Sequence, residues 1–160
     1  AADTAVPAWH DVHRELPMVF AGSATAAASG AALLACPVRE TAPMRTTAVL
    51  GAALELAAAK WMEHRAGLVA EPYRKGKGGR FVRAGEILSV AGATGGALFG
   101  GRSRAAAALS GAALLAGSAC TRFGVFHAGV QSAKDPKYTV VPQRERLAAA
   151  AEPSAKQSAL

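Results

Sequence analysis

The chain has 160 residues, of which 51% are hydrophobic but only 6% aromatic, and its formal charge is +7 at pH 7. Few aromatic side chains argue against a large soluble core, because such a core needs bulky side chains to fill it. The basic residues flank apolar stretches instead of clustering on their own, which argues against nucleic-acid binding.

Four long apolar stretches dominate the sequence. Residues 16–38 contain no charged side chain, and the stretches 46–59, 87–101 and 105–121 contain only one, Glu55. Because a helix rises about 1.5 Å per residue, the first stretch covers about 34 Å, enough to cross a hydrocarbon core of about 30 Å. The sequence therefore predicts an all-α fold, an integral membrane four-helix bundle that contacts the lipid bilayer directly.

The predicted organisation has three parts. Residues 1–15 form an interfacial entry segment, and residues 16–132 form the transmembrane bundle. Its helices are expected at about 16–38, 45–65, 81–101 and 104–132, with a flexible connector in the glycine-rich part before residue 81. Residues 133–160 are expected to be a C-terminal tail, extended at first and disordered after about residue 147. The alternative is a soluble, alanine-rich bundle, but residues 22–30 and 105–117 offer no charged stripe to face water.

The placement of the basic residues predicts an orientation. Thirteen Lys and Arg residues lie in the entry segment, in the 60–83 region or in the tail, whereas four lie in the two short connections between helices, namely Arg39, Arg45, Arg102 and Arg104. Cytoplasmic segments of membrane proteins carry the excess of Lys and Arg. We therefore expect the N-terminus, the 60–83 loop and the C-terminal tail to be cytoplasmic.

Small residues at four-residue spacing predict where the helices pack. Gly22 and Gly30 lie on one face of the first helix, and Gly92, Gly96 and Gly100 lie on one face of the third. Small side chains let helix backbones approach closely in lipid. We expect the backbone of another helix to pass close to Gly96, at the centre of its face.

Two ionisable residues lie at membrane depth. Glu55 is ten residues from both Arg45 and Arg65, and Arg122 lies within the fourth helix. An unpaired charge at this depth is costly, and such groups are functional candidates. Two interpretations remain open: a structural ion pair between Glu55 and Arg122, or a proton relay.

The remaining reactive residues predict neither a metal site nor a catalytic site. Cys36 and Cys120 are far apart and form no metal-binding pair. His64 and His127 end the second and fourth helices, so haem ligation between them is an alternative. The other two histidines, His10 and His13, lie near Glu15 but do not make a metal site by themselves.

Two segments resemble a known family. Residues 3–24 (DTAVPAWHDVHRELPMVFAGSA) resemble the segment that enters a later membrane helix in the NrfD family, the membrane subunits of polysulfide reductase and its relatives. Residues 121–144 (TRFGVFHAGVQSAKDPKYTVVPQR) resemble the carboxyl end of that family in GC-rich bacteria, of actinobacterial type.

The resemblance implies a role in a larger complex. Members of the family are integral proteins of eight to ten helices in the bacterial cell membrane. They anchor an iron–sulfur subunit and a molybdopterin-type catalytic subunit, and they exchange electrons with membrane quinones such as menaquinone. The chain, which begins at Ala1 without a Met, would then be the C-terminal half of such a protein and would contact its N-terminal half.

Cofactor and function follow from the same comparison. In the best-understood relatives the quinone pocket lies in the N-terminal bundle, so we expect no cofactor in this part of the protein. The expected function is that of a non-catalytic membrane subunit passing electrons between quinone and an iron–sulfur partner. The alternatives are a proton-coupled small-molecule transporter, which would also centre on a membrane Glu, and a haem-binding cytochrome-type anchor.

Overall fold

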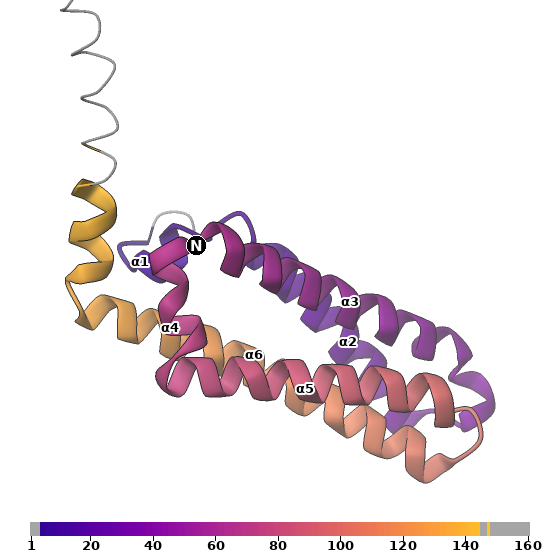
Figure 1. Cartoon of the computed structure of the whole chain (residues 1–160). Coiled ribbons are helices and arrows are strands. Elements are labelled where there is room, and N and C mark those ends of the chain that lie inside the picture. Colours follow the sequence, from indigo (N-terminus) through magenta and orange to yellow (C-terminus); the bar gives the residue numbers. More distant parts are fainter. Residues whose placement is uncertain (1–3, 145–146, 148–160) are drawn as a thin grey trace, which may run out of the picture.

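A computed structural model describes residues 4–144 and 147, and the regular secondary structure of these residues is entirely helical (Figure 1). The predicted all-α class is therefore confirmed. The elements in chain order are α1 (Pro7–His10), α2 (Leu16–Ala35), the 3-10 turn η1 (Val38–Glu40), α3 (Ala42–Arg65), the 3-10 turn η2 (Gly67–Ala70), α4 (Glu71–Arg74), α5 (Gly76–Phe99) and α6 (Arg104–Lys134).

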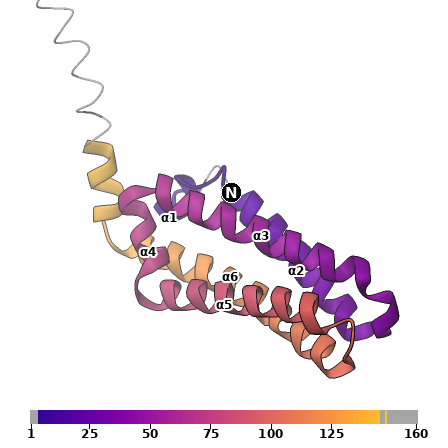
Figure 2. The same cartoon turned by 45° about the vertical axis from the view of Figure 1, so that its right-hand side comes forward.

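Four long helices form the body of the molecule. Helix α5 packs along α6 and α2 along α3, and the two pairs join where α2 contacts α6 and α3 contacts α5. Figures 1 and 2 show the two pairs as two layers of antiparallel helices. The short connections 36–41 and 100–103 lie at one end, which we call the short-loop end. Helices α1 and α4 and the end of α6 lie at the other, which we call the basic end (Figure 1).

Local sequence explains where the helices begin and end. Pro17 and Pro43 lie in the first turns of α2 and α3, where a missing N–H costs nothing. Helix α2 ends at Ala35 because Cys36, the residue before Pro37, is held extended. At the start of α6 the Ser103 hydroxyl accepts a hydrogen bond from the amide of Ala106 at 3.3 Å.

Two predicted segments are more ordered than the sequence suggested. Helix α5 begins at Gly76, so most of the predicted flexible connector forms α4 and the first turns of α5. Gly78 permits this because its Cα faces the carbonyl oxygen of Pro72 and the backbone of Ala128, where a side chain has no room. The tail was predicted to be extended, but residues 137–144 are helical. The predicted disorder after residue 147 lies outside the described residues.

Glycines mark the closest helix approaches, but only some are the predicted ones. A Cβ on Gly22 would lie 2.8 Å from the carbonyl oxygen of Gly51, and one on Gly30 would lie 2.8 Å from that of Gly111. A Cβ on Gly92 would likewise lie 2.8 Å from the carbonyl oxygen of Ser110. These contacts join α2 to α3, α2 to α6 and α5 to α6.

The other two predicted packing glycines have looser surroundings. A Cβ on Gly96 would meet only side chains of neighbouring helices, with Leu33 at 3.3 Å and Ser110 at 3.5 Å. Gly100 follows the last residue of α5, and the atoms nearest to it belong to Gly96 of the same segment. The close backbone approach expected at Gly96 is therefore corrected: among the predicted packing glycines, Gly22, Gly30 and Gly92 lie against the backbone of another helix.

The bundle buries several polar side chains and exposes many large apolar ones, around a core that also holds apolar side chains such as Ala26, Leu33 and Leu114. Its buried polar residues include Ser23, Ser29, Glu55, Ser89, Ser110, Ser118 and Thr121. Large apolar side chains instead lie on the outside, among them Leu50, Trp61, Ile87, Leu98, Phe99, Leu109, Phe123 and Phe126, each more than half exposed.

By length and composition, two of the described helices are suited to cross a membrane, α2 and α6. Four such helices were expected. Helices α3 and α5 differ because charged residues occupy their ends at the basic end, including Lys60 and Glu63 on α3 and Arg80 and Arg83 on α5.

Candidate functional site

The centre of the bundle is built around Glu55, in the middle of α3. Its side chain points inward and the residue is only 4% exposed. The hydroxyl of Ser89 on α5 donates a hydrogen bond to Glu55 Oε2 at 3.0 Å, and the hydroxyl of Thr121 on α6 donates one to Oε1 at 2.7 Å. Both carboxyl oxygens are therefore satisfied by neutral donors from two other helices.

Helix α2, the remaining long helix, also lines this region. Gly22 of α2 lies against the backbone of Glu55, so α2 and α3 touch at this level. The next residue, Ser23, donates a hydrogen bond from its hydroxyl to Ser118 Oγ on α6 at 2.9 Å. We call Ser23, Glu55, Ser89, Ser118 and Thr121 the polar layer.

Arg122 lies beside the polar layer but outside it. Its residue is exposed, and its guanidinium donates hydrogen bonds to the carbonyl oxygen of Ser118 at 3.0 Å and to the Ser118 hydroxyl. The ion pair between Glu55 and Arg122, one of the two interpretations that the sequence left open, is absent from the described residues. Successive helical residues are turned by about 100°, so Thr121 faces Glu55 and Arg122 points elsewhere.

Sequence reasoning missed the hydroxyl groups of the polar layer. It considered only ionisable residues, whereas both hydrogen-bond donors to Glu55 are neutral. The available signal was Ser89 and Thr121, each placed in an apolar helix at the depth of Glu55. A buried carboxylate needs donors, so hydroxyl residues at that depth were the candidates to examine.

The two histidines named as alternative haem ligands, His64 and His127, lie in different surroundings. His64 is exposed on α3, whereas the His127 ring on α6 stacks on Phe81 with ring centroids 5.4 Å apart. Across residues 4–144 no three His, Cys, Asp or Glu residues gather in a group able to hold a metal ion.

The entry segment forms a cap over the basic end. The Tyr73 hydroxyl donates to the carbonyl oxygen of Ala8 at 2.7 Å, and the indole N–H of Trp9 donates to that of Val125 at 3.0 Å. Burial raises the pKa of the Tyr73 phenol. Arg65 at the end of α3 pairs with the buried Glu15, just before α2, at 2.5 Å, so the entry segment is fastened to the bundle at several points.

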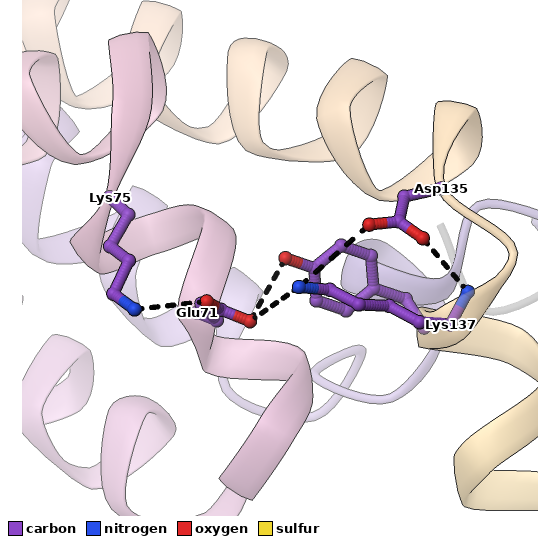
Figure 3. A network of polar contacts seen from close by, with 5 residues as sticks. Glu71, Lys75, Asp135 and Lys137 are labelled. Carbon is purple, nitrogen blue, oxygen red and sulfur yellow. Dashed lines mark hydrogen bonds and ion pairs between the residues drawn. The ribbon is translucent and has the colours of Figure 1, made fainter.

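A second polar cluster fastens residues 137–144, which we call the C-terminal helix, to α4. Lys137 Nζ donates to Glu71 Oε2 at 2.9 Å, the Tyr138 hydroxyl donates to the same oxygen at 3.2 Å, and Lys75 donates to Oε1 at 3.1 Å (Figure 3). These donors, Lys137 above all, lower the pKa of Glu71 from 4.5 to about 2. The same contact raises the pKa of Lys137.

Comparisons of the chain with protein-family models, with curated proteins and with solved structures found no match. The candidate site is therefore defined by its geometry: a carboxylate at the centre of four helices, held by hydroxyl groups, with the charged residues other than Glu55 and Arg122 gathered toward the two ends. Chemically, such a group is suited to holding and passing a proton between hydroxyl neighbours.

Proposed function

We propose that this chain is an integral membrane protein whose four long helices cross the bilayer together. The observation that carries the proposal is the apolar outer surface of the bundle: large side chains such as Leu50, Ile87 and Phe123 face outward, while Glu55 and several serine and threonine hydroxyls are buried. In a bilayer these outer side chains would contact lipid at no cost in free energy. In water, the exposure of so much apolar surface would be unfavourable.

The same proposal accounts for α3 and α5. Between Arg45 and Lys60 the only charged residue of α3 is Glu55, which is enclosed and hydrogen-bonded. Long Lys and Arg side chains near helix ends reach toward the headgroups while their methylene stems stay in the apolar region. We place the basic end in the cytoplasm because eleven of the described Lys and Arg residues belong to it.

Within the membrane, we propose the role of a non-catalytic subunit of a quinone-linked oxidoreductase. The residues supporting this role are 3–24 and 121–144, which resemble the NrfD family. The electron-transfer partners would be an iron–sulfur subunit and a molybdopterin-type subunit, with quinone bound by the N-terminal half of the full protein. Glu55 would move protons beside that electron path.

The test is purification of the tagged full-length protein from its native membranes in mild detergent. We expect a second polypeptide carrying iron and acid-labile sulfide to co-purify, and its clusters to become reduced when a quinol is added. Recovery of the membrane-embedded protein without iron–sulfur clusters would contradict the electron-transfer role.

One observation favours a second candidate function, a proton-coupled transporter. Glu55 is enclosed by hydroxyls from two other helices, an arrangement that also suits an exchange site for protons. A transporter would purify without clusters, and its reconstituted form would acidify vesicles in a substrate-dependent manner that Glu55→Gln abolishes.

A further inference from the structure

A long hollow runs along the outer face of α5 and α6 at the basic end. One part, of about 490 Å³, is lined by Lys77, Arg80, Phe81, Ala84, Cys120 and His127. The adjoining part, of about 570 Å³, shares Lys77 and His127 with the first and is lined further along α6 by Phe126, Val130, Gln131, Lys134 and Asp135. We call the two parts together the α5–α6 groove.

The groove is polar at one end and apolar at the other. Lys77 lies in the first turn of α5 and Lys134 in the last turn of α6, so both are at the basic end. Phe81, Ala84 and Cys120 lie deeper, toward the middle of the bundle. A ligand that fits this gradient has an anionic head and an apolar body.

The cations of the groove have no anionic partner within the described residues. Neither Lys77, Arg80 nor Lys134 takes part in an ion pair, whereas Arg65, Arg74, Lys75 and Lys137 at the same end each pair with a carboxylate. The one carboxylate on the groove, Asp135, is engaged by Lys137, whose amide donates to it at 3.0 Å. The groove is thus a site of uncompensated positive charge.

The position of Lys77 in the first turn of α5 adds to the uncompensated positive charge of the groove. The N-terminus of α5 carries neither a side-chain cap nor an acidic residue in its first turn. The helix dipole there favours an anion and disfavours a cation. A bound anion would relieve both the dipole and the unpaired side chains.

We propose that the α5–α6 groove binds an anionic phospholipid. Its phosphodiester headgroup would lie between Lys77, Arg80 and Lys134, and an acyl chain would follow Phe81 toward Cys120. This inference rests on the proposed membrane placement, because the groove then opens at the level of the cytoplasmic headgroups. Basic pockets between helices on that side of a membrane protein suit anionic headgroups.

The test compares lipid binding to the full chain in detergent by native mass spectrometry, with phosphatidylglycerol and phosphatidylcholine as the two probes. We expect retention of phosphatidylglycerol to exceed that of phosphatidylcholine. The double change Lys77→Gln with Arg80→Gln should weaken phosphatidylglycerol binding about 30-fold, and Lys134→Gln alone should weaken it less. The matched control, Arg39→Gln with Arg102→Gln, removes two cations from the short-loop end and should leave binding unchanged.

Flotation with phosphatidylcholine vesicles separates this proposal from the membrane placement. Protein that floats and resists alkaline carbonate but shows no phosphatidylglycerol preference overturns the lipid site alone. Protein that does not float overturns both proposals. Equal weakening by the control variant, or an equal thermal shift from inorganic phosphate, would also contradict a lipid site in the groove.

Discussion

Glu55 is tolerated at the centre of the bundle because two hydroxyl donors satisfy it without a counter-charge. A buried polar group left without partners costs about 1–3 kcal/mol, and a charged one costs more. Without Glu55, the hydroxyls of Ser89 and Thr121 could instead donate hydrogen bonds to carbonyl oxygens of their own helices. Their orientation toward Glu55 ties α3 to both α5 and α6.

Substitutions at Glu55 should separate hydrogen bonding from charge. Glu55→Gln keeps an acceptor oxygen of the same shape, so we expect stability in detergent to fall by less than about 1 kcal/mol. Glu55→Leu removes both acceptors and should cost about 2–3 kcal/mol. Chemical unfolding followed by circular dichroism measures both values. Equal losses would show that the polar layer does not hold the helices together.

A double-mutant cycle tests the absence of the ion pair. Because Arg122 bonds to Ser118 and not to Glu55, the effects of Glu55→Gln and Arg122→Gln on the free energy of unfolding should add to within about 0.5 kcal/mol. Recovery of stability in the double variant would instead reveal a direct pair.

In the assembled complex, Glu55→Gln should slow quinol-coupled turnover without reducing assembly if Glu55 relays protons.

For single residues, the sequence predicts how deep Glu55 lies in the bundle but not which side chains donate hydrogen bonds to it. Depth follows from counting residues to Arg45 and Arg65. The partner depends on helix rotation, and a turn of about 100° separates Thr121 from Arg122. Rotation is set by packing at glycines such as Gly22, whose contacts involve residues distant in sequence.

Among the helices, the closest approaches should be the most sensitive to added volume. A Cβ on Gly30 would lie 2.8 Å from a backbone oxygen of α6, which cannot move without shifting the helix. We expect Gly30→Ala to destabilise the fold by about 1–3 kcal/mol, typical of overpacking. Thermal unfolding in detergent measures the effect.

Gly96→Ala is the matched control on a neighbouring helix. Its new Cβ would meet only the Leu33 and Ser110 side chains, at 3.3 and 3.5 Å. Alanine gains up to about 1 kcal/mol of helix propensity over glycine, so the net change should be close to zero. A larger loss at Gly96 than at Gly30 would contradict the observed packing.

The contact between α4 and the C-terminal helix should depend on pH through Glu71. Its folded pKa of about 2 lies below the ordinary 4.5, so the contact contributes stability that is fully present above about pH 4.5. That stability is lost as the pH falls through about 2. Hydrogen-exchange protection of residues 137–144, corrected for intrinsic rates, should fall over that window in the native chain.

Glu71→Gln supplies the control for this pH dependence. Without the carboxylate, protection of residues 137–144 should already be low at pH 6 and should change little on acidification. Lys75→Gln removes one donor to Glu71 but keeps Lys137 and Tyr138, so it should retain most of the protection. A native-like acid profile in Glu71→Gln would show that another group controls the contact.

Helix ends were predictable only where local chemistry decides them. Pro17, Pro43 and Pro136 act through backbone geometry, and the helices begin or end near them. The segment 76–80 reads as a flexible loop because it is rich in glycine, yet it is helical because those glycines fit against α4 and α6. Residues 137–144 likewise depend on a distant partner, Glu71.

On the scale of the whole molecule, two independent asymmetries point the same way. Large apolar side chains lie on the outside while Glu55 and several hydroxyls are buried, and eleven of the described Lys and Arg residues belong to the end that carries α1, α4 and the C-terminal segment. The charge pattern was visible in the sequence as apolar stretches bounded by Lys and Arg. Which residues of each helix face outward required the structure.

The most direct test of the central claim is the sidedness of single cysteines in intact cells. Lys77→Cys and Arg102→Cys place exposed thiols at the basic and short-loop ends, in a background where Cys36 and Cys120 are replaced by alanine. With a membrane-impermeant maleimide, we expect labelling of Arg102→Cys in intact cells and of Lys77→Cys only after lysis, with the protein in the carbonate-resistant membrane fraction. Recovery in the soluble fraction would contradict the membrane placement, and the reverse labelling pattern would contradict the orientation.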